Sequence, residues 1–458
     1  MKIYNSLGKK KQIFKTIKKN TVKIYVCGIT AYDHCHIGHA RSFLAFDMIV
    51  RFLRFKKYKV VFVRNITDID DKIINKSIKN NISIKEVTDK YIVSMQQDIE
   101  SLNLIPPSFE PRATQYIEKM ILFIEKLIKK EFAYKSKNGD IYFSIDKFKR
   151  YGELSCNNMD NLQQFRENKE KNNIKDFTLW KMSKPNEPKW NSPWGQGRPG
   201  WHLECSVMSM EKLGVNFDIH GGGRDLLFPH HENEKAQSEA LTNQTFSNYW
   251  MHVGCLNINK NKMSKSLKND ISIKSLLNDY HQETIRLFFF SCHYRKSMDF
   301  SYKNMQLCED KIVKMYLSVV NVKYEDIELT DHSNCSFRLR FLNAMEDDFN
   351  TPLALAVIYD LHNQLENFKN KTQRKEIAIM AKKLVTLSNI LGIMSEIPLH
   401  FLQNRKKVDR KFIKKQIALR SFEKKKKNWK AADKIRDDLF KMNIQIQDLE
   451  NKTFWYIL

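Results

Sequence analysis

The chain has 458 residues, of which 42% are hydrophobic and 12% are aromatic. This length predicts about two to four domains of roughly 100 to 200 residues each, and this composition excludes general disorder. The 78 Lys and Arg residues against 52 Asp and Glu residues leave a formal net charge of +26. Such a charge favours a polyanionic partner such as nucleic acid, through counterion release. Mutational bias in an AT-rich genome is an alternative cause, because Lys, Ile and Asn are abundant throughout the sequence.

Targeting signals and disulfides are not expected. The N-terminal residues MKIYNSLGKKKQIFK lack the apolar stretch of a signal peptide, and no run of about 18 apolar residues follows. We therefore expect a cytoplasmic protein that does not enter a membrane. The eight cysteines are scattered and include no CxxC pair. A cysteine that does chemistry in such a chain is expected to bind a metal ion, together with ligands from distant segments.

Residues 23–28, KIYVCG, predict a short buried strand. The following ARSFLAFDMIVRFLRF carries apolar side chains at helical spacing, and YKVVFVR predicts a second strand at once. A strand, a helix and a strand in this order form a right-handed crossover unit, with ligands at the carboxyl ends of the strands. The fold prediction is therefore α/β, with a Rossmann-like parallel sheet.

Later segments predict that this sheet is interrupted and then replaced by helices. Helical patterns at about 72–103 and 112–131 and an exposed polar insertion at 155–176 come first. The second half of the sheet follows, with a helix at 201–213, the strand VNFDIH, a glycine turn and a helix that begins near PHHENE. Beyond about residue 270 strand signals fade, and from residue 406 the composition becomes strongly basic.

Two histidines stand at the mouth of the first predicted helix, in the sequence His36-Ile-Gly-His39. The free amides and positive dipole of a helix start favour phosphate, and Gly38 would let a base or ribose approach the backbone. An HxxH pattern alone is more often a surface or core pair. Its position directly after a buried strand favours a nucleotide site.

Residues 262–266 read KMSKS, which gives Lys262 and Lys265 the spacing to reach phosphates as mobile point charges. The pentapeptide and HIGH together resemble the paired signature of class I aminoacyl-tRNA synthetases. Within that class the chain resembles the cysteine-specific family. The segments that carry this resemblance are YVCGIT at 25–30, RNITDIDDKI at 64–73, GRPGWHLECS at 197–206, FDIHGGGRDLLFPHHENE at 217–234 and DDFNTP at 347–352.

A metal site is also predicted from the residues themselves. Cys27 ends a predicted strand, Cys205 lies in a predicted helix, and His230 and Glu234 stand four apart on one helical face. Two thiolates, an imidazole and a carboxylate suit zinc, although a single cysteine is more often a small buried hydrophobe. The resemblance implies that these four residues bind one Zn²⁺ per chain.

The resemblance implies that the chain activates L-cysteine with ATP and Mg²⁺ and transfers it to tRNA(Cys), as a monomer. It assigns stabilisation of the transition state to His36, His39, Lys262 and Lys265. ATP binding is expected at Gly38, Gly222, Asp225 and Lys265, and substrate binding at Thr67 and Trp201. The alternative interpretations of Thr67 and Trp201 are a turn residue and a core aromatic.

On this basis the predicted fold is a Rossmann-like parallel sheet split by an insertion, followed by a helical bundle and a small C-terminal domain. The two halves of the catalytic domain are expected at 1–110 and 191–255, around a connective insertion at 111–190. A region with the KMSKS loop and a stem contact is expected at 256–308, a tRNA-binding helical bundle at 309–400 and a small basic anticodon-binding domain at 401–458.

Some features leave alternatives open. Lys268 stands where the family commonly has glycine, which puts the mobility of the KMSKS loop in doubt. Trp429 and Trp455 lie among the charges of the tail and either stack on RNA bases or belong to a solvated helix face and a small core. Alternative functions are a cysteine ligase that acts on a small amine, whose known relatives lack a basic tail, and a non-catalytic zinc protein that binds nucleic acid.

Overall fold

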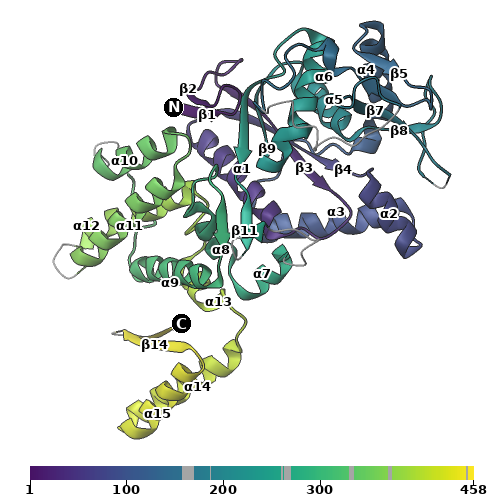
Figure 1. Cartoon of the computed structure of the whole chain (residues 1–458). Helices are drawn as coiled ribbons and strands as arrows, with labels where there is room; N and C mark the ends of the chain where they lie inside the picture. Colours follow the sequence, from purple (N-terminus) through teal and green to yellow (C-terminus); the bar gives the residue numbers. More distant parts are fainter. Residues whose placement is uncertain are drawn as a thin grey trace. The chain divides into compact units, whose positions relative to one another are not determined.

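A computed structural model describes residues 1–156, 170–185, 187–258, 261–262, 270–329, 335–369, 374–449 and 452–458 (Figure 1). The chain forms two compact units. Unit one comprises Met1–Lys274, Phe289–Phe300 and Leu342–Leu353, and unit two comprises Ser275–Phe288, Ser301–Phe341 and Ala354–Leu458. In the part of the chain described, no helix is both long and apolar enough to cross a membrane.

Unit one is built on a parallel sheet with the strand order β10-β9-β3-β4. Its strands are β3 (Thr21–Thr30), β4 (Lys59–Thr67), β9 (Phe217–Gly223) and β10 (Ser247–Val253). Helix α1 (Ile37–Phe55) connects β3 to β4, and α6 (Glu232–Thr242) lies between β9 and β10 in the chain. The predicted α/β fold, with a parallel sheet divided by an insertion, is confirmed.

The register between β3 and β4 shifts between Val26 and Ile29. Gly28 lies in this irregularity, and a Cβ atom on it would stand 1.7 Å from the carbonyl oxygen of Asn65. The amide of Gly28 donates instead to the side-chain oxygen of Asn65, at 2.8 Å. The two strands therefore approach closely next to Cys27, at the carboxyl end of β3.

The insertion between β4 and β9 contains helices and an antiparallel sheet of order β5-β6-β7-β8. The helices are α2 (Asp71–Asn80), α3 (Ile84–Ser101), α4 (Ile117–Lys129) and α5 (Trp201–Leu213). The strands are β5 (Ala133–Lys135), β6 (Ile141–Phe143), β7 (Phe177–Met182) and β8 (Gly197–Pro199). The predicted helical stretch at 72–103 is broken at Asn81, which adopts a left-handed conformation with φ 51°. Of the predicted polar insertion at 155–176, residues 157–169 lie outside the described residues.

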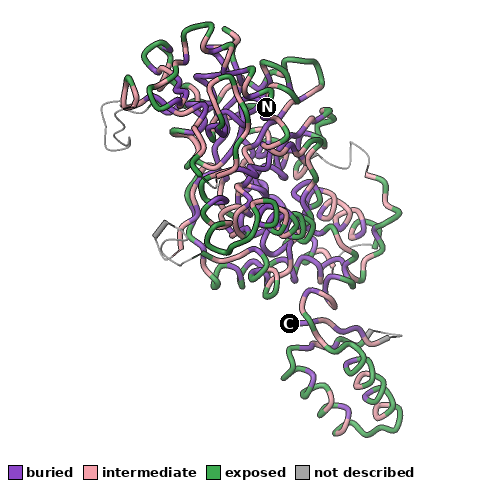
Figure 2. Tube along the Cα trace, turned by 90° about the vertical axis from the view of Figure 1, so that its right-hand side faces the viewer, coloured by how far each residue is buried: buried purple, intermediate pink, exposed green. Residues whose placement is uncertain are grey.

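Short strands complete unit one. The N-terminal hairpin pairs β1 (Lys2–Asn5) with β2 (Lys10–Ile13), and a three-stranded sheet has the order β12-β11-β13. Its members are β11 (Leu256–Ile258), β12 (Asn261–Lys262) and β13 (Met298–Phe300). Most residues of β4 and β9 are buried, and Figure 2 marks the buried residues along the chain.

Helices dominate the second half of the chain, as the sequence predicted. They are α7 (Ile273–Asp279), α8 (Gln282–Phe290), α9 (Tyr302–Val319), α10 (Cys335–Glu346), α11 (Thr351–Phe368), α12 (Arg374–Ile390) and α13 (Pro398–Asn404). Within unit two, the buried carboxylate of Glu283 accepts hydrogen bonds from Tyr316 and from the amides of Met394 and Ser395, at 2.8–2.9 Å. This carboxylate joins α8 to α9 and to the turn after α12.

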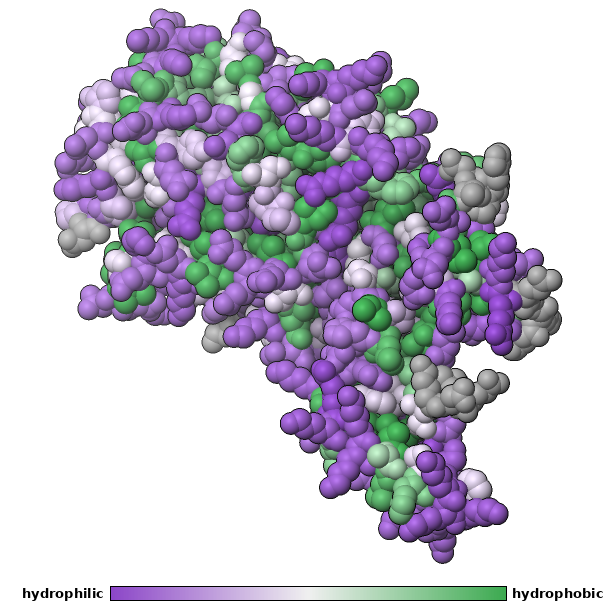
Figure 3. Space-filling view, turned by 180° about the vertical axis from the view of Figure 1, so that it is seen from behind, coloured by the Kyte–Doolittle hydropathy of each residue, from purple (hydrophilic) through white to green (hydrophobic). Residues whose placement is uncertain are grey.

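The C-terminal residues of unit two form two helices and a hairpin. Helices α14 (Arg410–Lys425) and α15 (Trp429–Lys441) precede the antiparallel strands β14 (Ile444–Leu449) and β15 (Lys452–Ile457). Trp455 packs in their small core and is 4% exposed, whereas Trp429 is 58% exposed. The core interpretation therefore holds for Trp455. Towards the lower end of Figure 3, hydrophobic side chains of this region show between hydrophilic ones.

We expect Trp455→Ala to destabilise the C-terminal hairpin by about 3–5 kcal/mol, because it removes a large side chain from a small core. The matched variant Trp429→Ala removes an exposed indole and should change stability by no more than about 0.5 kcal/mol. Amide hydrogen exchange of residues 444–449 and 452–457 measures both effects. Equal protection in the two variants would contradict the assignment.

Candidate active site

A cavity of about 340 Å³ lies at the carboxyl ends of the parallel strands of unit one. It is lined from the end of β3, the start of α1, the turn after β9 and the residues after β10. In open parallel sheets, this edge is where ligands bind. The predicted site residues that line the cavity are Cys27, His36, Gly38, His39, Trp201 and Asp225.

His36 and His39 begin helix α1 by capping one another. The amide of His36 donates to Nδ1 of His39 at 3.2 Å, and the amide of His39 donates to Nδ1 of His36 at 3.4 Å. The two rings stack with centroids 3.8 Å apart and planes 15° apart. HIGH is therefore a reciprocal capping box in which histidines replace the usual serine and glutamate.

The chain that follows the KMSKS segment is hydrogen-bonded to the start of HIGH. The amide of Ile37 donates to the carbonyl of Ile271 at 2.9 Å, and the amide of Ile273 donates to the carbonyl of Cys35 at 3.0 Å. Lys262 lies in β12, but its side chain is outside the described part of the structure, as are Lys265 and Lys268. The roles expected of Lys262 and Lys265 stay predictions.

The four predicted metal ligands meet at one end of β3. Cys27 Sγ lies 3.6 Å from Cys205 Sγ and 3.4 Å from Glu234 Oε1, and His230 Nε2 lies 3.0 Å from the same Oε1. Zinc binds sulfur at about 2.3 Å and nitrogen or oxygen at about 2.0–2.2 Å, so neighbouring ligand atoms of a tetrahedral site stand about 3.3–3.8 Å apart. The observed separations are close to this range, and the donor set fits zinc.

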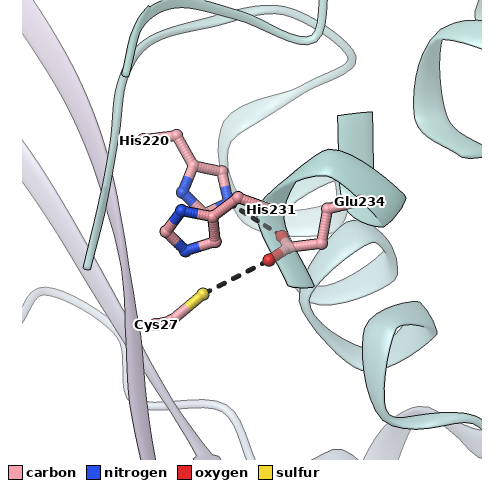
Figure 4. A group of neighbouring side chains, drawn as sticks. All are labelled: Cys27, His220, His231 and Glu234. Carbon is pink, nitrogen blue, oxygen red and sulfur yellow. Dashed lines mark hydrogen bonds and ion pairs between the residues drawn. The ribbon is translucent and has the colours of Figure 1, made fainter. Parts of the chain in front are cut away.

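Glu234 also belongs to a second possible group, which contains Cys27, His220 and His231 (Figure 4). His220 Nε2 lies 2.8 Å from Glu234 Oε2, while Oε1 of the same carboxylate faces Cys27. Nδ1 of His231 contacts His252 Nε2 at 2.8 Å, and its buried Nε2 has no hydrogen-bond partner among the described residues. The contact with His220 fixes the orientation of the Glu234 carboxylate that both groups share.

His202 contacts His230 much as His220 contacts Glu234. The Nδ1 atoms of His202 and His230 lie 2.9 Å apart. This contact leaves Nε2 of His230 directed at Glu234. Sequence reasoning missed both His220 and His202. A histidine within the predicted strand VNFDIH, directly before the glycine turn, was the available signal for His220.

The cluster of Cys27, Cys205, His230 and Glu234 is largely buried and carries negative charge. Burial raises the pKa of Glu234, but the imidazoles of His220 and His230 outweigh it and hold the pKa well below the usual range. Burial likewise opposes ionisation of Cys205, but its hydrogen bond with Cys27 and contact with His230 lower its pKa to about 6. Burial also opposes protonation of His230, whereas Glu234 and Cys205 raise its pKa to about 10. A buried thiolate and carboxylate of this kind are suited to a cation.

The remaining predicted residues differ in their surroundings. Trp201 is 40% exposed, and its ring centroid lies 4.2 Å from that of His230, so it forms a wall beside the cluster. Thr67 is buried and donates to Glu204 Oε2 at 2.8 Å. A Cβ atom on Gly222 would meet the ring of His231 at 2.9 Å, and it is the next residue, Gly223, that lines the cavity.

Comparison with known proteins shows the family to which this chain belongs. Residues 13–310 match the family described as the tRNA synthetases class I (C) catalytic domain, and residues 340–395 match the DALR domain. A cysteine–tRNA ligase of Coxiella burnetii (strain Dugway 5J108-111) is 46% identical over 99% of both chains. The chain belongs to the cysteine–tRNA ligase family.

Other members of this family are similarly close. The cysteine–tRNA ligase of Legionella pneumophila (strain Philadelphia 1) is 45% identical, and the match covers 99% of this chain and 98% of that protein. Among solved structures, methionyl-tRNA synthetase of Mycobacterium tuberculosis in complex with methionyl-adenylate aligns with a TM-score of 0.59 at 14% identity, over 84% of this chain and 91% of that one. This likeness shows that the fold is that of class I synthetases.

Proposed function

We propose that this chain activates L-cysteine with ATP to form cysteinyl-adenylate and then transfers cysteine to tRNA(Cys). One observation carries the proposal: a single cavity is lined both by Cys27 of the thiol, imidazole and carboxylate cluster and by His36 and His39 of HIGH. The thiol of the substrate and its reacting carboxylate lie at opposite ends of a small molecule. The cavity offers suitable groups for both ends.

Cys27, Cys205, His230 and Glu234 would hold the zinc ion. Zinc at this position would supply a soft Lewis acid that prefers a thiolate to a hydroxyl. Selectivity is needed because a difference of one small group is worth only about 1–3 kcal/mol in a pocket that selects by shape. Trp201 closes the same end of the cavity against His230. Serine would lose the thiolate contact and be rejected without a separate editing domain.

In the first step, the carboxylate of cysteine attacks the α-phosphate of ATP in line, and pyrophosphate leaves. His36 and His39 stabilise the developing charge from the start of α1, assisted by Lys262, Lys265 and Mg²⁺ bound with ATP. Gly38 has no side chain and allows the nucleotide to approach the helix start, where the helix dipole favours phosphate. The turn with Gly222 and Asp225 receives the ribose and adenine. Thr67, through its bond with Glu204, would support the pocket from behind.

In the second step, a hydroxyl of the terminal ribose of the tRNA attacks the carbonyl carbon of cysteinyl-adenylate, and AMP leaves. Two functions compete with this proposal. A ligase that acts on a small amine would share the first step but not the second. A non-catalytic zinc protein that binds nucleic acid would perform neither step.

Cysteine-dependent exchange of pyrophosphate into ATP tests the proposal. The purified protein should exchange with cysteine, and serine at equal concentration should give at least about 100-fold less exchange, which corresponds to about 2.7 kcal/mol of discrimination. Charging of tRNA(Cys) transcript then separates a tRNA ligase from an amine ligase. No exchange by folded, zinc-loaded protein would contradict the proposal and favour the non-catalytic alternative.

A further inference from the structure

Lys72 lies in the first turn of α2, the first helix after β4 in the chain, and lines the cavity that holds HIGH. The N-cap residue Asp70 accepts a hydrogen bond from the amide of Lys72 at 2.8 Å, which fixes the backbone at this point. The ammonium of Lys72 stands 5.3 Å from the centroid of the Tyr32 ring, and Tyr32 also lines the cavity. The aromatic ring of Tyr32 attracts the Lys72 ammonium through its negative face. Unlike a carboxylate, the ring does not neutralise the positive charge.

Among the described residues the Lys72 ammonium forms no salt bridge, whereas its neighbours do. Asp71 pairs with Arg198 and with Lys181, and Lys76 pairs with Asp33 at 3.3 Å. Over the ranges that the structure describes, no carboxylate oxygen lies within 4.0 Å of the Lys72 ammonium. Among the described side chains that line the cavity, Lys72 alone carries a permanent positive charge.

Both reactants of the activation step carry negative charge where they meet. The amino acid brings a carboxylate, ATP brings its α-phosphate, and the product is an acyl phosphate. The described walls of the cavity add the carboxylate of Asp225 and lie next to the anionic cluster. A preorganised cation in a partly enclosed site lowers the cost of bringing such groups together.

We propose that Lys72 is a further catalytic residue, whose ammonium binds the carboxylate of the amino acid and then the phosphate of the acyl-adenylate. The inference rests on the proposed function and names a contact within it. In this arrangement the cluster holds the thiol end of cysteine, and Lys72 holds the carboxylate end. Tyr32 keeps the ammonium in place before the substrate arrives.

The variant Lys72→Met removes the charge and keeps much of the length of the side chain. Lys76→Met is the matched control, because Lys76 lies one turn further along α2, also stands over a tyrosine ring and does not line the cavity. We expect Lys72→Met to lower kcat/KM for cysteine in pyrophosphate exchange about 10- to 100-fold. Lys76→Met should change it less than about threefold, and both variants should retain zinc.

A comparison of ligands tests the carboxylate contact directly. Cysteinamide keeps the thiol and amine of cysteine but carries no carboxylate. Equilibrium binding of cysteine should weaken about 10-fold or more in Lys72→Met, while binding of cysteinamide stays within about twofold. Lys72→Arg should restore part of the binding of cysteine, since it restores the charge.

Three outcomes would overturn the inference. One is an equal loss of cysteine and cysteinamide binding, which would indicate a structural role. Another is unchanged exchange in Lys72→Met together with unchanged transfer to tRNA. The third is normal exchange with impaired transfer to tRNA, which would place Lys72 at the acceptor end of the tRNA instead. Absence of exchange in the unmodified protein would be a failure of the proposed function and is recognised before any variant is made.

Discussion

Cys205→Ser should lose its zinc and lose cysteine-dependent pyrophosphate exchange by at least about 100-fold. A hydroxyl is a poor ligand for zinc compared with a thiolate, and zinc affinity depends on ligands that are deprotonated near neutral pH. Cys205 is 2% exposed and lies 3.6 Å from Cys27, so solvent cannot easily replace the lost sulfur. Metal analysis of the purified variant and an exchange assay with excess cysteine measure the two effects.

Cys308→Ser is the matched control for this prediction. Cys308 is also a buried cysteine, 7% exposed, but it lies in α9 of unit two, outside the cluster. It should keep one zinc per chain and at least half of the exchange activity. If Cys205→Ser retained stoichiometric zinc and normal exchange, the cluster would not be the metal site. Loss of zinc with normal exchange would leave the metal site in place and remove its role in recognising cysteine.

Gly28→Ala should destabilise unit one by about 3 kcal/mol or more and displace Cys27. The new Cβ would stand 1.7 Å from the backbone carbonyl of Asn65, a contact that only movement of β3 or β4 can relieve. Asn65 also accepts from the amide of Gly28, so the movement would break a hydrogen bond inside the sheet. Chemical unfolding monitored by circular dichroism measures the stability, and zinc content reports the position of Cys27.

Gly8→Ala serves as the comparison, because a Cβ atom there meets nothing within 4 Å. Its φ of 80° still makes alanine unfavourable, so a cost of about 1 kcal/mol is expected. Zinc content should not change. A Gly28→Ala protein as stable as the Gly8→Ala protein would mean that the strands separate without penalty, and the structural account of the register shift would be wrong.

Much of the parallel sheet could be predicted because its strands are long and its connections are local. β3 and β4 are runs of apolar residues on either side of an amphipathic helix, which is the pattern of a crossover unit. The strands β5, β6 and β8 could not be predicted, since each has three residues, too few to show alternation. Their pairing depends on residues far along the chain, such as Trp180 with Pro199.

The convergence of Cys27, Cys205, His230 and Glu234 could be predicted because His230 and Glu234 stand four apart in the sequence and because the surrounding motifs resemble those of a known family. The histidines that support it could not be predicted from spacing. His220 and His202 act through contacts with Glu234 and His230 that only the packing of β9, α5 and α6 creates. Lys72 was visible only as one residue of RNITDIDDKI, and nothing in the surrounding residues indicates that it lines the cavity.

The capping box of His36 and His39 also determines which ring nitrogen carries the proton. Each Nδ1 accepts an amide hydrogen, so each neutral ring is the Nε2–H tautomer. Two N–H donors are thereby fixed in direction by the backbone of α1. They can donate to a phosphate oxygen while both imidazoles remain uncharged, and the stacked pair does not have to gain a proton before ATP binds.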